Sequence, residues 1–291
     1  MMDISVYTLN AFTKNNQGGN PAGVVLYADG LSADHMQRIA KEVGFSETAF
    51  IQSSEKADFL VRFFTPTDEV PICGHATLAA FHAMLSENMI HPGMYTQETK
   101  AGILEVEVKE EGFVFLTQNL PQFEAELNRE RIAHSLNIHT EDLDPDLPVQ
   151  IVSTGLRDVM VPVRSFDVLE AINPNFDQIL TISRQYEAVG YHVFYAGTGT
   201  KNTAYCRNFA PLYGILEESA TGSSTGALSC YLYQHRKVKA YQAHDLQFEQ
   251  GHMMGAVSEL KAHLVVNGQG EMTKISVGGL CSAIGLQILH L

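Results

Sequence analysis

Two short segments of the sequence place a glycine before small residues in a way that suits anion binding. They are centred on Gly74-His75 in the first half of the chain and on Gly222-Ser223 in the second half. In both segments the glycine allows a sharp bend, and the residues after it begin a helical pattern. First-turn N–H groups have no partner within their helix, and the helix dipole adds partial positive charge beside them. The pattern predicts two turns that bind a carboxylate, and two ordinary capped helices are the alternative.

A single glutamate, Glu47, lies among apolar neighbours between Phe45 and Phe50. Burial beside apolar groups raises the pKa of a carboxyl toward the range that suits proton transfer. Glu47 is therefore a candidate general acid and base, and a surface glutamate at a strand edge is the alternative. The corresponding place in the second half lies near Val193, where the sequence has no acid to duplicate it.

Cys73 and Thr221 precede the two turn glycines and occupy matching places. A thiol at a helix N-terminus has a lowered pKa and can act as a base, whereas an alcohol is a poor base toward carbon. A symmetrical mechanism with two thiols is therefore excluded. The sequence leaves open whether Cys73 is reactive or a buried structural residue.

His75 and Glu218 are the other polar candidates beside the turns. His75 follows the first turn glycine, where it either binds substrate or has a structural role. Glu218 lies four residues before Gly222 and, with Glu217, could also be a solvated loop pair. His75 and His82 have no third ligand at a recognisable spacing, and no nucleotide-binding motif occurs, so we predict neither a metal nor an organic cofactor.

The two halves of the chain repeat one order of motifs at an offset of about 145 residues, which is too long for a solenoid repeat. An Arg-x-Phe-x-Pro motif begins at Arg62 in the first half, and a similar Arg-x-Phe-x-Pro motif begins at Arg207 in the second. The repeat predicts an N-terminal lobe over 1–120 and a C-terminal lobe over 121–291, with the ligand in a cleft between them. Each lobe should bury one helix of small or apolar residues, over 77–85 and over 226–233.

The bulk composition excludes several classes of protein. A net charge of −14 and the absence of a basic stripe argue against binding to nucleic acid. No run approaches the ~20 apolar residues of a membrane span, and the first residues do not form a signal peptide. The four cysteines lack a CxxC spacing, which favours a reducing cytoplasm.

Together these motifs resemble the PhzF-like, or phenazine-biosynthesis-like, isomerase family of the diaminopimelate-epimerase fold. The resemblance covers nearly the whole chain and rests on five segments, 19–24, 46–50, 62–66, 71–77 and 217–223. It implies an α+β fold of two pseudo-symmetric lobes, each a curved and mostly antiparallel sheet around a central helix. It also implies isomerase chemistry without a cofactor, and a homodimer.

The resemblance also assigns roles to residues of the site. In the phenazine enzyme the glutamate of a Ser-Glu-Thr segment moves a proton along a dihydro-hydroxyanthranilate, and Glu47 occupies that position. The family histidine corresponds to His75 and the family serine to Ser223. The usual Asp-Pro before the second turn is replaced by Glu218-Ser219, which changes the expected fit of the substrate.

These observations lead to one preferred function and two alternatives. We expect a cofactor-independent isomerase that moves a proton on a small carboxylate substrate with Glu47 as general acid and base. N–H groups at the two turns would stabilise the negative charge, and His75 and Glu218 would orient a polar substituent. One alternative is an epimerase, racemase or dehydratase that uses Cys73 with Thr221 opposite. The other is a binding protein of the same fold without catalysis.

Overall fold

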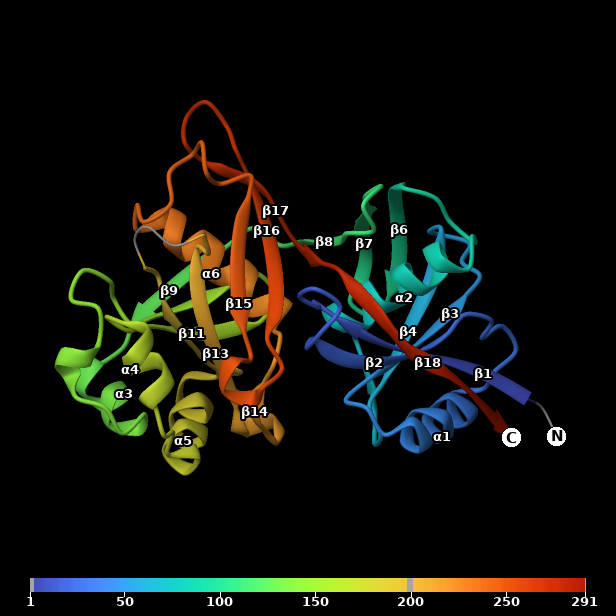
Figure 1. The fold of residues 1–291 in the computed structure, drawn as a ribbon, viewed down its shortest axis with the longest axis horizontal. Helices are drawn as coiled ribbons and strands as arrows, with labels where there is room; N and C mark the ends of the chain where they lie inside the picture. Colours follow the sequence, from blue (N-terminus) through green and yellow to red (C-terminus); the bar gives the residue numbers. More distant parts are fainter. Residues whose placement is uncertain (1–2, 198–200, 291) are drawn as a thin grey trace. The chain divides into compact units, whose positions relative to one another are not determined.

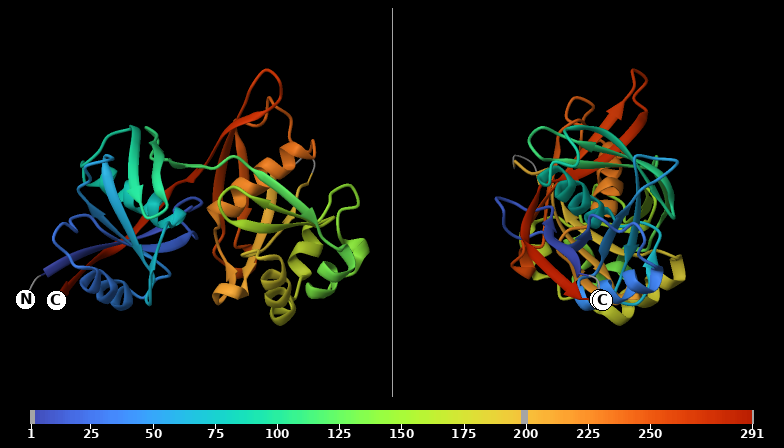
Figure 2. Two further views of the ribbon diagram at one scale, coloured as in Figure 1. Left: turned by 180° about the vertical axis from the view of Figure 1, so that it is seen from behind. Right: turned by 90° about the vertical axis from the view of Figure 1, so that its right-hand side faces the viewer.

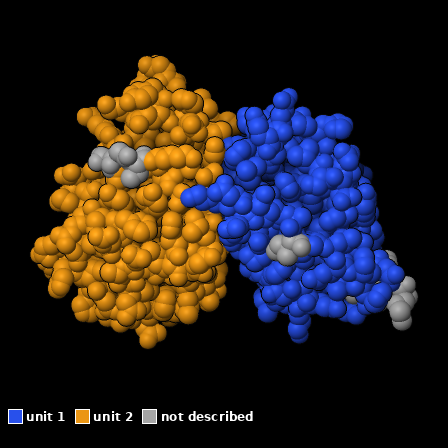
Figure 3. Space-filling view, viewed as in Figure 1, with its two compact units in different colours: residues 1–117, 278–291 blue, residues 118–277 orange. Residues whose placement is uncertain are grey.

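The chain forms two compact units, which a computed structural model describes over residues 3–197 and 201–290 (Figure 1). Unit 1 contains Met1–Thr117 and Gly278–Leu291, and unit 2 contains Gln118–Val277 (Figure 3). The strands of each unit pair mostly with one another and mostly antiparallel, and each unit has its own hydrophobic core. No helix in the described part of the chain is long and apolar enough to cross a membrane.

Unit 1 is a sheet with one helix on each face. Its elements are β1 (Asp3–Ala11), β2 (Asn20–Val25), α1 (Ala33–Val43), β3 (Thr48–Gln52), β4 (Phe59–Phe64), β5 (Glu69–Val70), α2 (Gly74–Ser86), β6 (Gly93–Thr99), β7 (Gly102–Val108), β8 (Val114–Gln118) and β18 (Cys281–His290). The strands pair in the order β18-β1-β2-β3-β4-β6-β7-β8. The pairs β2–β3 and β4–β6 are parallel and the others are antiparallel.

Unit 2 repeats this plan with additional short helices. Its elements are β9 (Gln122–Glu126), α3 (Arg129–Ser135), η1 (Thr140–Asp142), β10 (Gln150–Ser153), β11 (Arg157–Pro162), α4 (Phe166–Ala171), α5 (Phe176–Tyr186), β12 (Gly190–Tyr195), β13 (Ala204–Ala210), η2 (Pro211–Tyr213), β14 (Ile215–Glu218), α6 (Gly222–Gln234), β15 (Leu246–Gln250), η3 (His252–Met254), β16 (Ser258–Val266) and β17 (Met272–Gly279). Here β11–β12 and β13–β15 are the parallel pairs, so the alternation from β10 to β16 matches that from β1 to β7. The predicted α+β class with two similar lobes is confirmed.

The two buried helices differ from ordinary surface helices in their composition. The helix α1 has one apolar face, begins after the capping side chain of Ser32 and ends at Gly44 in the left-handed conformation. By contrast, α2 and α6 are buried on nearly every side and lack a polar face. They pack on β1, β2 and β3 in unit 1 and on β10, β11 and β16 in unit 2.

Both buried helices begin earlier than the sequence pattern predicts. The first helical residue is Gly74 instead of residue 77, and Gly222 instead of residue 226. Glycine and serine have low intrinsic helix propensity, so the first turn is not visible as a helical pattern. Packing inside each unit overrides that propensity, and the turn glycines thereby become the first residues of the helices.

The last strand of the chain belongs to unit 1, which differs from the predicted lobe boundaries of 1–120 and 121–291. β18 pairs with β1 in antiparallel register from Asp3–His290 to Ala11–Cys281, and the two strands lie side by side (Figure 2). The repeated motifs do not cover this strand, so only the pairing shows that β18 lies beside β1 as β9 lies beside β10. The first boundary lies close to the predicted one, between Thr117 and Gln118.

Candidate active site

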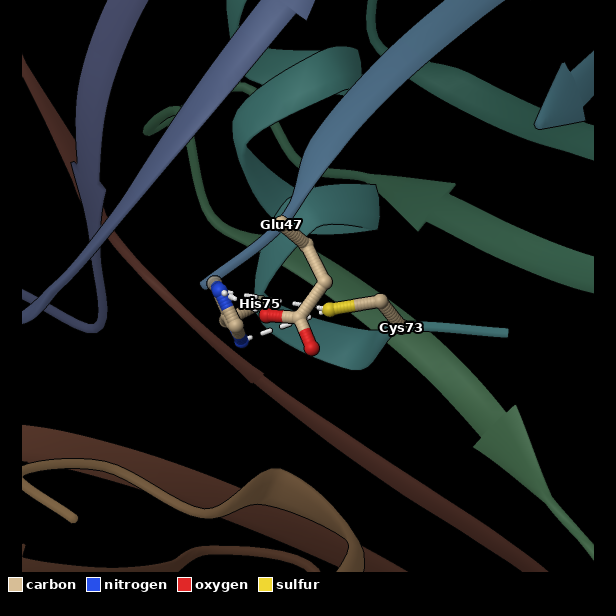
Figure 4. Close-up of side chains that lie close together, drawn as sticks. All are labelled: Glu47, Cys73 and His75. Atoms are coloured by element: carbon tan, nitrogen blue, oxygen red, sulfur yellow. Dashed lines mark hydrogen bonds and ion pairs between the residues drawn. The ribbon is translucent and has the colours of Figure 1, made fainter. Parts of the chain in front are cut away.

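Glu47, Cys73 and His75 form one cluster in unit 1, and their side chains point toward one another (Figure 4). Nε2 of His75 lies 3.3 Å from Oε2 of Glu47. Nδ1 of the same ring lies 3.4 Å from the Cys73 Sγ. The hydroxyl of Ser46 is 3.4 Å from His75 Nε2. The imidazole is thus the centre of the cluster, with a carboxylate near one nitrogen and a thiol near the other.

The cluster is assembled by two chain segments that meet at the end of the sheet. Glu47 lies directly before β3, and its carbonyl accepts a hydrogen bond from the Gly23 N–H at 3.1 Å. A Cβ atom at Gly23 would lie 2.7 Å from Oγ1 of Thr48, so a larger residue there would force the Thr48 side chain to move. Cys73 is the N-cap residue of α2 and His75 lies in its first turn.

Burial keeps His75 neutral near pH 7. The exposed fraction is 7% for His75 and 8% for Cys73, against 20% for the Glu47 side chain, which gives the cluster its access to solvent. Burial lowers the pKa of His75, while the Glu47 charge and a hydrogen bond to the Pro21 carbonyl oppose that shift. Oε2 of Glu47 is itself buried and has no hydrogen-bond partner among the described residues, since its contact with His75 lacks hydrogen-bond geometry.

The start of α6 in unit 2 has the same local construction as the start of α2. In the described structure, neither Cys73 nor Thr221 caps the first-turn N–H groups with its side chain. Thr77 donates from Oγ1 to the Cys73 carbonyl at 2.8 Å, and Thr225 donates to the Thr221 carbonyl at 2.9 Å. Each helix therefore presents first-turn N–H groups together with the positive end of its dipole.

Two matching ion pairs, both partly buried, support the helix starts, and the sequence analysis missed them. Arg62 forms a two-pronged contact with Glu69, with Nε–Oε1 and Nη2–Oε2 distances of 2.7 and 2.9 Å. Arg207 contacts Glu217 in the same way, at 2.9 Å for both bonds. Such bidentate pairs fix geometry as well as charge. In the sequence, each glutamate lies five residues before its turn glycine, and this spacing could have revealed the pairs.

The Glu218 side chain contacts the start of α6, so Glu217 and Glu218 do not form a solvated loop pair. The hydroxyl of Thr221 donates to Oε2 of Glu218 at 2.5 Å. Gln250 donates from Nε2 to the Glu218 carbonyl at 2.6 Å and to the Thr221 Oγ1 at 3.0 Å. Since its hydroxyl is engaged by two neighbours, Thr221 is a poor candidate for an opposing base.

A buried polar network lies between the sheet of unit 2 and the first turn of α6. Ser224 donates to Oδ2 of Asp158 at 2.7 Å, and Asn208 donates to the Ser224 Oγ at 3.1 Å. Nδ2 of Asn208 also lies 3.2 Å from Nδ1 of His192. Burial raises the pKa of Asp158 to about 7 and lowers the pKa of His192 to about 3. Sequence reasoning missed this network because its members lie on four different elements.

The strand registers correct one detail of the sequence comparison. Tyr191 pairs with Phe209 in β12–β13, where Thr48 pairs with Phe64 in β3–β4. The counterpart of Glu47 is therefore Gly190 instead of Val193. The two halves still differ in the way the sequence indicates, because unit 2 has no acid at this position.

The predicted site residues thus fall into two groups, each assembled within its own unit. Unit 1 brings together Glu47, Cys73, Gly74 and His75, and unit 2 brings together Glu218, Thr221, Gly222 and Ser223. The first group contains a carboxylate, a thiol and an imidazole, which are proton-transfer groups as well as metal ligands. The second group contains a carboxylate, hydroxyls and helix N–H groups, which suit polar and anionic parts of a ligand.

Comparison with known proteins identifies the relatives of this chain. The profile of the phenazine biosynthesis-like protein family, PhzC-PhzF, matches residues 9–284. A Clostridium acetobutylicum protein named as an uncharacterized isomerase is 38% identical over 286 residues, which are 94% of each chain. The trans-2,3-dihydro-3-hydroxyanthranilate isomerase of Pseudomonas chlororaphis is 30% identical over 93% of this chain and 94% of its own.

Solved structures agree with this assignment. A Bacillus anthracis phenazine biosynthesis protein of the PhzF family superposes with a TM-score of 0.89 over the full length of both chains, at 33% identity. A hydroxyproline epimerase from Agrobacterium vitis shares the fold alone, with a TM-score of 0.60 and 11% identity over 99% of this chain and 92% of its own. The chain therefore belongs to the phenazine biosynthesis-like family and is a PhzF-like isomerase.

Proposed function

We propose that this isomerase moves a proton between two carbons of a small carboxylate substrate, with Glu47 as general acid and base and without a cofactor. The observation that supports the proposal most is the state of Oε2 of Glu47. This carboxylate oxygen is buried, accepts no hydrogen bond from the described residues and lies beside a neutral imidazole. A general base needs a basic oxygen that no hydrogen-bond donor already occupies, and Oε2 of Glu47 meets that requirement among the described residues.

The proposed reaction conserves protons and electrons. Glu47 removes a proton from a substrate carbon, and the electron pair of the broken C–H bond enters the adjacent π system. Protonated Glu47 then delivers the proton to a second carbon, so that a C–H bond forms there and the carboxylate is restored. The first-turn N–H groups around Gly74-His75 stabilise the negative charge that develops on a substrate oxygen.

For the substrate we propose a small carboxylate with a second polar substituent, cyclic or amino-acid-like. A related enzyme of this family isomerises trans-2,3-dihydro-3-hydroxyanthranilate, which has both features. We assign the recognition of anionic and polar groups to the residues of each unit: the N–H groups at Gly74-His75 with the His75 ring in unit 1, and the N–H groups at Gly222-Ser223 with Glu218 in unit 2. The longer side chain of Glu218 and its contact with Thr221 give this chain its own specificity.

We further propose a homodimeric enzyme of the cytoplasm that binds neither membrane nor nucleic acid. All four cysteines are buried and reduced, which fits a reducing compartment. The net charge of −14 disfavours binding to phosphates. Light scattering of the purified protein tests the dimer, and a single-chain mass would refute it.

The function can be tested by a metabolite screen in deuterated water. A proton that Glu47 exchanges with solvent introduces deuterium at a carbon of the substrate, and mass spectrometry detects the label in whichever metabolite carries it. The wild-type protein should label a small carboxylate, and Glu47→Gln should not. Saturable binding of carboxylates without labelling or turnover would instead indicate the non-catalytic binding protein.

A second candidate, an epimerase or dehydratase that uses Cys73 as base, is favoured by one contact. The Cys73 Sγ lies 3.4 Å from Nδ1 of His75, and such a thiol–imidazole pair can form a thiolate. The two candidates predict opposite rankings of variants. With a Glu47 base, Glu47→Gln is more damaging than Cys73→Ser, and with a Cys73 base the order is reversed.

A further inference from the structure

Glu47, Cys73 and His75 are also a set of metal-binding side chains. One carboxylate oxygen, one thiol sulfur and one imidazole nitrogen all lie within 4.8 Å of one another. The sequence conceals the set, because Glu47 is far from the other two in the chain and no recognised ligand spacing results. The counterparts in unit 2, Gly190, Thr221 and Ser223, provide no such combination, so the set belongs to unit 1 alone.

One of the three distances already fits a tetrahedral zinc ion, and the other two are somewhat longer. With Zn–N and Zn–O bonds of about 2.0–2.2 Å and a Zn–S bond of about 2.3 Å, neighbouring ligand atoms lie about 3.3–3.6 Å apart. Nε2 of His75 and Oε2 of Glu47 are already 3.3 Å apart. The Cys73 Sγ is 3.9 Å from the same Nε2 and within 4.8 Å of a Glu47 carboxylate oxygen. Rotation of the Cys73 and Glu47 side chains would bring the sulfur to bonding distance.

The hydrogen bonds of the cluster also favour a cation. One ring N–H of His75 donates to the Pro21 carbonyl. The second ring nitrogen therefore offers a lone pair, which is the arrangement found in most metal-binding histidines. Oε2 of Glu47 is buried and has no hydrogen-bond partner in the described part of the chain. A cation between these two acceptor atoms would satisfy both.

The donor types select the metal. A thiolate and an imidazole favour Zn²⁺ over Mg²⁺ or Ca²⁺, which prefer oxygen ligands. One thiolate and one carboxylate balance the charge of a divalent ion, so the partly buried site would be neutral. The exposed edge of Glu47 leaves room for a water molecule as fourth ligand.

We propose that Glu47, Cys73 and His75 bind one Zn²⁺ ion, with Cys73 as thiolate, and that the zinc-bound form is inactive. Binding displaces the thiol proton into solvent, so the affinity increases with pH. The inhibition rests on the proposed function, because zinc occupies the Glu47 oxygen that would remove the substrate proton. The binding itself does not depend on that function.

Zinc binding is measured on the full-length protein, stripped of metal, by competition with a chromogenic chelator. We expect one saturable site, with affinity reduced at least about tenfold by Cys73→Ala and by His75→Gln. His91→Gln is the matched control, because this histidine of unit 1 is exposed and its hydrogen bonds to described residues join its backbone N–H and carbonyl to the Tyr95 hydroxyl. Replacement of zinc by Co²⁺ should give a thiolate charge-transfer band that Cys73→Ala abolishes.

The outcomes separate the two parts of the proposal. Absence of a saturable site, or equal affinity in the wild type, Cys73→Ala and His75→Gln, overturns the zinc site. Zinc that binds with one-to-one stoichiometry and leaves turnover unchanged overturns the inhibition alone. The proposed function fails on a separate result, full turnover of Glu47→Gln in the absence of metal.

Discussion

The two buried helices of the molecule face equivalent positions that are filled in opposite ways. In unit 2 three polar strand residues, Asp158, His192 and Asn208, lie next to Ser224 of α6. By strand register and repeat offset, the same positions in unit 1 are apolar: Ala22, Ala49 and Phe63 on the strands and Ala76 in α2. All eight side chains are buried. One backbone plan therefore tolerates either a packed apolar layer or a hydrogen-bonded network.

The two units place their polar groups differently. In unit 1 the residues between the sheet and α2 form an apolar layer, and the polar groups of the candidate site, Glu47 and His75, lie at the start of α2. In unit 2 the polar groups Asp158 and Asn208 lie between the sheet and α6, where they hydrogen-bond to Ser224 and restrain the first turn of the helix. Among the described residues of unit 1, which bears the candidate base, no Asp or Glu is buried in the way that Asp158 is in unit 2.

The largest expected effect is on turnover, from Glu47→Gln. The amide has nearly the same shape but cannot accept the proton, so the rate should fall by about 10²–10⁴-fold while the fold is retained. Rates on a substrate found by deuterium labelling, together with circular dichroism, check this. Glu218→Gln, which replaces the carboxylate beside the start of α6 in unit 2, should change mainly KM. A near wild-type rate for Glu47→Gln would assign Glu47 a structural role and remove the functional asymmetry between the units.

Gly190→Ala should show that position 190, the counterpart of Glu47 in unit 2, has no room for a side chain, and therefore none for a glutamate. A Cβ atom there would lie 2.0 Å from the Phe209 carbonyl oxygen and 2.9 Å from the Ala210 Cα, both backbone atoms. We expect a loss of about 1–3 kcal/mol or more in the free energy of unfolding, from urea denaturation. Gly268→Ala is the control, because a Cβ atom at that position would meet no other described residue within 4 Å beyond its chain neighbours. Equal stability of both variants would contradict the register assignment.

Asp158→Asn should change how stability depends on pH. The folded protein keeps the Asp158 proton up to about pH 7, whereas the unfolded chain releases it near pH 4, so the contribution of Asp158 to stability falls as pH rises between these values. His192 has a folded pKa of about 3, so its contribution rises with pH from about 3 to 6.5 and opposes that of Asp158. Asp158→Asn removes the pH-dependent contribution of Asp158 to stability and leaves that of His192.

Relative to the wild type, Asp158→Asn should therefore become more stable between pH 5 and pH 8. The gain is at most about 1.4 kcal/mol per pKa unit, or a few kcal/mol in all. Urea midpoints of the two proteins at both pH values measure it. Asp158→Ala, which also removes the Ser224 acceptor, is the control for the lost hydrogen bond. The same difference at both pH values would mean that Asp158 is ionised throughout.

A smaller effect is expected on ligand binding at the start of α6. Gly222→Val should block the approach of a carboxylate to the first-turn N–H groups and weaken binding by at least about tenfold. Ser223→Ala removes one hydroxyl and leaves the backbone donors, so it should cost only about 0.5–1.5 kcal/mol. Calorimetric titration with the identified substrate or an analogue gives the binding affinities of Gly222→Val and Ser223→Ala, and hence their order. If Ser223→Ala is the more damaging change, side-chain contacts dominate at this helix start.

Local patterns make part of the site predictable from the sequence. The turn glycines Gly74 and Gly222 and the isolated acid Glu47 are visible because each is defined by its immediate neighbours. The contact of Glu47 with Cys73 and His75 is not visible, because it depends on where β3 begins relative to α2. The helices start at 74 and 222, earlier than the pattern predicts, since burial overrides the low helix propensity of glycine and serine.

Long-range contacts set the limit of such reasoning. Asp158 and Ser224 are separated by 66 residues, and only the fold shows that they meet. The pairing of β18 with β1 spans nearly the whole chain, so no repeat or periodicity could reveal it. The Arg62–Glu69 and Arg207–Glu217 pairs are an intermediate case, because their repeated spacing before the turn glycine is present in the sequence.

The return of β18 to unit 1 has a consequence for the order of folding during synthesis. Unit 2 is one continuous stretch of chain, Gln118–Val277, and can fold as soon as it leaves the ribosome. Unit 1 is made first but keeps the edge of β1 unpaired until β18 has followed the whole of unit 2. An unpaired strand edge invites aggregation. The unit that carries Glu47 is thus the first to be translated and the last to be completed.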